Sequence, residues 1–151
     1  MNKGFTLFVA MIIMGTLLLI ATGVASLAVR QGLISSIGKE SQEAFYAADT
    51  GIECALYWDV GNPSGISAFA TNTPASLVFC NKDASNLTNE WLVGGASVST
   101  INRINFLPDP FCAIVTVTKA PNGSTLIESK GYNTCDASSS RRVERAVRAR
   151  Y

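Results

Sequence analysis

A run of 25 residues without a charged side chain, from Phe5 to Val29, constrains this chain more than any other feature of its sequence. Lys3 and Arg30 bracket the run. At about 1.5 Å per residue, a helix of this length crosses a hydrocarbon core of about 30 Å. The run also accounts for an overall composition of 48% hydrophobic and only 15% charged residues, because the remaining residues are unexceptional. The sequence therefore predicts a membrane-length helix joined to one domain of ordinary size.

Three interpretations of this segment compete. A secretory signal peptide has a shorter apolar stretch, of about 7–15 residues, before a small-residue cleavage site. The sequence Ala28-Val29-Arg30 is a poor site of that kind. A plain membrane anchor is the interpretation that hydropathy alone favours. The third interpretation rests on the start of the run, where a positive charge, a glycine and a phenylalanine occur in the order Lys3-Gly4-Phe5-Thr6-Leu7.

This five-residue motif resembles the cleavage site of type IV prepilins and of type II secretion pseudopilins. In that family a prepilin peptidase in the membrane cuts after the glycine, and the new N-terminal phenylalanine is usually methylated. The resemblance implies a leader over residues 1–4 and a cut between Gly4 and Phe5. It also implies that the apolar helix over residues 5–30 is retained, first as a membrane anchor and later as the core of a filament.

One position departs from the family's pattern. Members usually have a glutamate five residues into the mature chain, and that position here is Val9. The glutamate is thought to neutralise the N-terminal ammonium of a neighbouring subunit in the apolar filament core, where an unpaired charge is costly. A subunit at the filament tip has no neighbour above it, so Val9 favours a tip or priming subunit. The alternative is a lipid-facing valine in an anchor that never assembles, and methylation of Phe5 stays open because in some members it depends on the glutamate.

Beyond Arg30 the apolar residues recur in steps of three and four, which predicts an amphipathic helix over residues 31–58. The first strong stop is Gly61-Asn62-Pro63, so the helix is expected to end near Trp58. A continuous helix from Phe5 to Trp58 would be about 81 Å long, which exceeds any membrane crossing. Its second half must therefore pack against another part of the chain.

The block from Ala44 to Glu53, Ala-Phe-Tyr-Ala-Ala-Asp-Thr-Gly-Ile-Glu, strengthens the likeness. It resembles the end of the N-terminal module in minor pilins of the PilX type, where an alanine-rich helix carries a similar block. The resemblance covers residues 1–58 well and the remainder only in outline. It implies an α+β, pilin-like fold, in which one long N-terminal helix joins a globular head over residues 59–151 with a small antiparallel β-sheet.

Within the head, residues 59–111 carry four of the five prolines and are interpreted as a connecting region of short elements and long loops. Two β-type runs follow, Cys112–Lys119 and Thr125–Tyr132, separated by a turn that contains Asn-Gly, and this pattern predicts a hairpin. The final segment, residues 142–151, fits either a helix or a strand by spacing, and its Arg-Arg-Val-Glu run is similar to the last strand of pilin-like heads. We therefore expect a three-stranded antiparallel sheet packed on the long helix.

The four cysteines form no Cys-x-x-Cys pair, and the chain has no histidine, which disfavours zinc. An even number beyond an export anchor favours two disulfides, for which three connectivities are open. In the predicted hairpin, facing residue numbers sum to about 244, which places Cys112 near Tyr132 and within reach of Cys135. Cys54 is then left to pair with Cys80.

No catalytic constellation is present in the sequence. It contains no Gly-x-Ser-x-Gly motif, no phosphate-binding glycine loop and no histidine for a triad. The acidic residues are scattered and show no metal-loop spacing. We therefore expect a protein that is not an enzyme and that needs neither a cofactor nor a metal.

Charge is distributed less evenly than the net charge of +1 suggests. Residues 141–151 hold five arginines and one glutamate, whereas residues 31–140 hold five basic and ten acidic residues. Such a basic edge could attract DNA or another polyanion, but only Tyr151 supplies an aromatic ring there, which weakens this interpretation. A solvated strand face or an intersubunit salt-bridge surface is favoured. The five residues are Arg141, Arg142, Arg145, Arg148 and Arg150.

Two functions of different classes remain. The favoured one is a structural minor pilin or pseudopilin, anchored in the inner membrane with its head outside the cytoplasm and then built into an extracellular type IV pilus or pilus-like filament. Its expected partners are other pilin subunits, the prepilin peptidase, the pilus assembly platform and, before assembly, membrane lipid. The alternative is a non-polymerising, single-pass anchored binding protein or adhesin with a disulfide-linked head.

Overall fold

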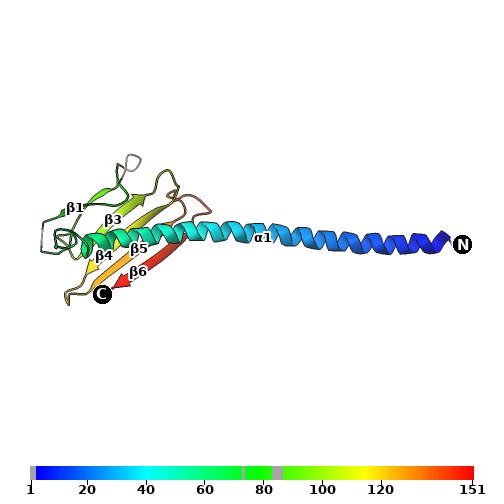
Figure 1. Cartoon of the computed structure of the whole chain (residues 1–151), viewed down its shortest axis with the longest axis horizontal. Coiled ribbons are helices and arrows are strands. Elements are labelled where there is room, and N and C mark those ends of the chain that lie inside the picture. Colours follow the sequence, from blue (N-terminus) through cyan, green and yellow to red (C-terminus); the bar gives the residue numbers. More distant parts are fainter. Residues whose placement is uncertain (1–2, 73, 83–86) are drawn as a thin grey trace. The chain divides into compact units, whose positions relative to one another are not determined.

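The computed structural model describes residues 3–72, 74–82 and 87–151, with the side chain of Lys3 excepted. Met1 and Asn2, which begin the expected leader, lie outside the described residues. The chain forms two compact units, residues 1–38 and 39–151. A long helix is followed by strands in the order α1 (Lys3–Asp59), β1 (Ser76–Phe79), β2 (Glu90–Val93), β3 (Val98–Asn105), β4 (Cys112–Lys119), β5 (Thr125–Tyr132) and β6 (Glu144–Arg150), as Figure 1 shows.

The second unit contains two antiparallel sheets. The larger has the strand order β3-β4-β5-β6, and the smaller is formed by β1 and β2. The predicted hairpin is confirmed, because Cys112 faces Tyr132 and Lys119 faces Thr125. The ambiguous last segment is a strand, and α1 ends at Asp59, one residue beyond the expected Trp58.

The larger sheet has four strands rather than the expected three, because β3 joins it from the region interpreted as a connection. A register shift between Ile101 and Ile104 explains why this strand was missed. Such an irregularity breaks the alternation of apolar and polar residues by which strands are recognised. The inward-facing Ser99, which is buried, weakens the pattern further.

Small residues form the contact between α1 and the sheet. Ala44, Ala48 and Ala55 are fully buried on α1. Opposite them, a Cβ atom added to Gly131 would overlap the backbone of Ala44 and Ala48. Gly51 on the helix is similarly close, because its Cβ would overlap the Ser129 hydroxyl. The helix backbone therefore approaches the sheet more closely than larger side chains would allow.

Larger apolar side chains fill the core around this contact. They come from α1, from the connection after it and from both sheets, so that a single buried cluster joins all parts of the head. Its largest fully buried members are Phe69, Ile101, Ile104, Ile127, Val78, Val115 and Val117.

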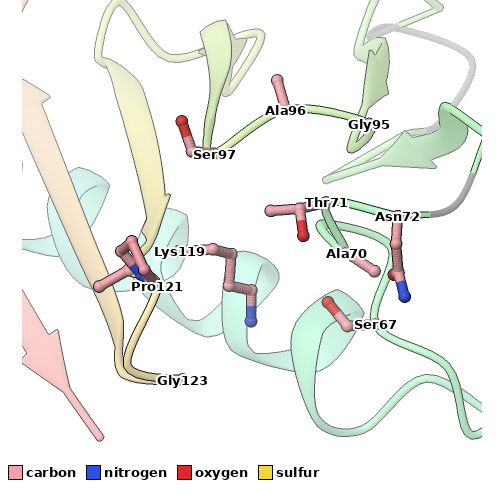
Figure 2. A pocket seen from close by; sticks show the side chains of 11 residues that line it. Ser67, Ala70, Thr71, Asn72, Gly95, Ala96, Ser97, Lys119, Pro121 and Gly123 are labelled. Carbon is pink, nitrogen blue, oxygen red and sulfur yellow. The ribbon is translucent and has the colours of Figure 1, made fainter.

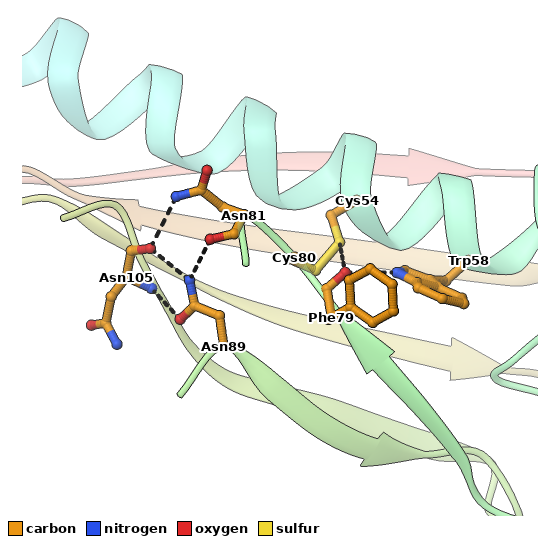
Figure 3. Close-up of a disulfide and its surroundings, with 7 residues drawn as sticks. All are labelled: Cys54, Trp58, Phe79, Cys80, Asn81, Asn89 and Asn105. Atoms are coloured by element: carbon orange, nitrogen blue, oxygen red, sulfur yellow. Dashed lines mark hydrogen bonds between the residues drawn. A yellow bond between two sulfur atoms is a disulfide. The ribbon is translucent and has the colours of Figure 1, made fainter. Parts of the chain in front are cut away.

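Two disulfides join Cys54 to Cys80 and Cys112 to Cys135, the pairing that the hairpin register favoured. The first ties α1 to the residue that follows β1, and Figure 3 shows its surroundings. Trp58 donates a hydrogen bond from its indole to the Phe79 carbonyl oxygen at 2.9 Å, and the two rings pack edge to face. The end of β1 is therefore fixed to the last turns of the helix by a covalent bond and by an aromatic contact.

The fully buried side chain of Asn89 holds the chain on the other side of this disulfide, also drawn in Figure 3. Its amide nitrogen donates to the Asn105 carbonyl oxygen at 2.8 Å, and its oxygen accepts from the Asn105 backbone amide at 3.0 Å. A buried amide with both ends bonded is a stable anchor. Asn89 thus fastens the segment before β2 to the end of β3.

The close helix–sheet contact predicts that Gly131→Ala lowers the free energy of unfolding by more than about 2 kcal/mol, because the new methyl group overlaps helix backbone that cannot move independently. Urea unfolding of the full chain in detergent micelles, followed by tryptophan fluorescence, measures this change. A Gly131→Ala protein as stable as the wild type would contradict the geometry.

Ser129→Ala is the matched control two residues earlier on the same strand. The Ser129 hydroxyl is buried and has no hydrogen-bond partner within the described part of the chain. Replacing an unsatisfied buried hydroxyl by a methyl group removes a desolvation cost. We expect Ser129→Ala to be equal to the wild type in stability or up to about 1 kcal/mol more stable.

Candidate functional site

The predicted cleavage site lies in the first turns of α1. Gly4 is exposed, and a Cβ atom added to it would contact nothing within 4 Å. Phe5 is 69% exposed. Both residues therefore lie on an exposed part of α1.

The rest of the first unit is a helix with an apolar surface. By length and composition, α1 is the one helix among the described residues that could cross a membrane. The hydroxyl groups of Thr16, Thr22 and Ser26 donate hydrogen bonds to carbonyl oxygens one turn earlier in the same helix. These polar side chains are therefore satisfied without water, as an apolar environment requires.

Val9 lies one helical turn after Phe5, on the same face of α1. It brings no charge to this turn. The first acidic residue of the whole chain is Glu40, so residues 5–38 contain no carboxylate side chain. An ammonium group created at Phe5 by cleavage would find no counter-ion in the unit to which it belongs.

Several of the C-terminal arginines have partners within the chain. Arg141 makes an ion pair with Glu40, and the Arg145 guanidinium donates to the Ser41 hydroxyl at 2.9 Å. Both partners lie on α1, within the second unit. The start of β6 and the segment before it are thus attached to the helix by two arginines.

The remaining arginines differ in their surroundings. Arg148 pairs with Glu128 on the neighbouring strand β5 at 2.7 Å. The Arg142 guanidinium lies 3.8 Å from the centre of the Tyr132 ring, which is a cation–π contact. Arg150 is exposed. The structure therefore brings the five arginines near one edge of the sheet but commits most of them to partners within the chain.

A buried polar cluster closes the opposite end of β6. Asp59, the last residue of α1, accepts hydrogen bonds from Ser67 and from the Tyr151 hydroxyl. It also accepts two bonds of 2.7 Å from the Lys119 ammonium, which donates its third proton to the Thr125 hydroxyl at 2.8 Å. This cluster joins the end of the helix to the hairpin and to the residue after β6.

The cluster disfavours ionisation of the Tyr151 phenol. Burial raises the pKa of the Tyr151 phenol, and its hydrogen bond to the Asp59 carboxylate raises this pKa further. A phenol that stays protonated remains a hydrogen-bond donor. Sequence spacing does not reveal this cluster, because Asp59 and its partners are up to 92 residues apart. The one available signal is an acidic residue at the expected end of the helix.

Metal ions in proteins are held by groups of side chains such as His, Cys, Asp and Glu. The described residues contain no group of three or more of these side chains placed to hold a metal ion. Both cysteine pairs are joined as disulfides.

Comparison with known families identifies the N-terminal part of the chain. Residues 3–53 match the model of a family described as "PilX N-terminal", which is a type IV pilin-like N-terminal region. The match lies wholly within α1, and the strands of the head lie outside it. Comparisons with curated proteins and with solved structures found no match.

The buried cluster predicts that Asp59→Asn lowers the free energy of unfolding by about 2–4 kcal/mol, since it leaves the Lys119 ammonium without its counter-ion. Tyr151→Phe removes one hydrogen bond to a carboxylate, and we expect it to lower the free energy of unfolding by about 1–2 kcal/mol. Urea unfolding of the full chain in micelles measures both.

The double variant Asp59→Asn/Tyr151→Phe tests whether these residues act together. Because the second change removes a bond that the first has already weakened, the combined loss should be smaller than the sum of the single losses. Strictly additive losses would show that Tyr151 stabilises the fold by some other contact.

Proposed function

We propose that this chain, whose residues 3–53 match the PilX N-terminal family model, is a structural minor pilin, cut after Gly4 and built into the tip of a type IV pilus or pilus-like filament. The pilin family consists typically of structural, non-enzymatic proteins. The single observation that carries the tip assignment is the absence of any carboxylate side chain before Glu40.

The apolar surface of the first unit supports assembly in two stages. Large side chains along it are exposed, for example Leu19 and Met14, each at 72%. Exposed apolar area of this extent is unfavourable in water at about 25 cal/mol per Å². Lipid covers such a helix before assembly, and the helices of neighbouring subunits cover it in a filament core. The membrane and other pilin subunits are therefore the two successive environments that we propose.

The absence of a carboxylate near the N-terminus supports a position at the tip. Cleavage before Phe5 leaves an α-amino group, whose usual pKa of about 7.7–8.0 keeps much of it protonated at neutral pH. In a filament core this ammonium needs a carboxylate from an adjacent subunit. A chain with Val9 cannot supply one to a subunit above it. At the tip this deficiency costs nothing, because no subunit lies above.

Processing provides the first test. In cells with an active prepilin peptidase, we expect mass spectrometry to find a mature chain that begins at Phe5. The variant Gly4→Val should keep Met1, since its side chain meets nothing within 4 Å and leaves α1 intact while altering the cut bond. A wild-type chain that still begins with Met1 and stays in the membrane would instead support the anchored binding protein.

Position in the filament provides the second test. We expect Val9→Glu to appear along the filament shaft, because the new carboxylate can neutralise a neighbouring ammonium. Val9→Gln, of similar size but uncharged, should stay at the tip. Labelled subunits counted along purified filaments distinguish these outcomes, and tip-only incorporation of Val9→Glu would refute the charge explanation.

A further inference from the structure

A hollow of about 650 Å³ opens beside the end of α1, among three loops of the second unit. We call it the loop hollow. Its lining comes from the connection after α1 (Ser67 to Asn72), from the turn between β2 and β3 (Gly95 to Ser97) and from the β4–β5 turn (Lys119 to Gly123), as Figure 2 shows. Its volume lies in the usual range of small-molecule sites, about 300–1,000 Å³.

Backbone bonds hold the three loops in place. The Gly95 amide donates to the Ala70 carbonyl oxygen at 2.8 Å, and the Lys119 amide donates to the Ser97 carbonyl oxygen at 2.7 Å. Gly94 has a φ of +89°, and a side chain there would overlap the Ala68 carbonyl oxygen. The loop hollow is therefore preformed, which lowers the ordering cost of binding.

The charge in the loop hollow is already compensated. Among the described residues that line it, Lys119 alone has a charged side chain. All three ammonium protons of Lys119 are donated, two to Asp59 and one to Thr125. An anionic ligand would have to displace a buried carboxylate from this ammonium, so the site disfavours phosphates and carboxylates.

The groups left for a ligand are neutral. Among the described residues, the side chains of Thr71, Asn72 and Ser97 have no hydrogen-bond partner, and Figure 2 shows the Thr71 side chain directed into the hollow. Hydroxyl and amide groups both donate and accept, which matches the hydroxyl groups of a sugar. The hollow also has small apolar surfaces, formed by Ala70, Ala120 and the ring of Pro121. These surfaces can contact the C–H faces of a sugar ring.

We infer that the loop hollow is a binding site for neutral carbohydrate. Its polar side chains fit the hydroxyl groups, its small apolar residues fit the ring faces, and its compensated charge excludes acidic sugars as preferred ligands. The site lies in the head alone, so it does not depend on cleavage at Gly4 or on assembly into a filament.

The experiment uses the full chain in dodecylphosphocholine micelles, which carry no sugar headgroup. Maltotriose and triacetylchitotriose are titrated separately to 20 mM, and amide chemical shifts are followed by NMR. We expect at least one trisaccharide to bind with a Kd in the millimolar range and to shift the amides of Thr71, Asn72 and Ser97. No shift with either sugar would overturn the proposal.

Variants of one threonine, with a matched control, locate the site. Thr71→Val keeps the shape but removes the hydroxyl, and we expect binding to weaken about 3- to 10-fold. Thr71→Trp should weaken binding more strongly, because its indole would occupy part of the hollow and also lacks the hydroxyl. Thr100→Val and Thr100→Trp, at an exposed threonine on β3, should bind like the wild type.

Two further outcomes would count against the inference. Undiminished binding by Thr71→Trp would place the sugar elsewhere. Tighter binding of glucose 6-phosphate than of the trisaccharides would show that Lys119 is available to anions, and that the neutral class of ligand is wrong. All measurements are made on unassembled protein. A lack of sugar binding would therefore not affect the proposed filament role, and a lack of filament assembly would not affect the proposed sugar binding.

Discussion

The close approach of α1 to the larger sheet is the contact on which the head depends. A helix with fully buried alanines and a sheet with Gly131 allow backbone to meet backbone, and the apolar core then fills the space on either side. Close packing at this contact stabilises the fold through dispersion forces and buried apolar area. A methyl group added at the contact would remove this stabilisation by overlap. Packing within the subunit therefore explains the small buried residues of the block from Ala44 to Glu53, namely its alanines and Gly51.

Polar contacts secure this packing at both ends of β6. Arg141 and Arg145 attach its beginning to Glu40 and Ser41, and Tyr151 attaches its end to Asp59. The strand at the edge of the sheet is thus fastened to the same helix at two places about 18 residues apart. Arginines at both ends of this strand region thus also stabilise the fold.

Local patterns explain what could be predicted from the sequence. The apolar run, the helical stripe beyond it and the Asn-Gly turn between two β-type runs each depend on residues close together in the chain, and each corresponds to α1 or to the β4–β5 hairpin. Strand β3 was missed because the shift between Ile101 and Ile104 breaks its alternation. The hairpin register favoured the disulfide pairing because it brought Cys112 near Cys135.

The candidate sites likewise divide into a local sequence motif and sites formed by distant segments of the chain. Gly4 and Phe5 form a local motif that a reader of the sequence can recognise, whereas the cluster around Asp59 and the loop hollow gather residues from separate segments. No spacing rule relates Thr71, Ser97 and Lys119, because only the folded loops bring them together.

The lack of a carboxylate before Glu40 has a consequence for the cell as well as for the subunit. On the proposed function, such a chain can receive a neighbour below it but cannot be followed by one above it. Its supply would then determine how many filaments exist, whereas the supply of carboxylate-bearing subunits would determine how long each one grows.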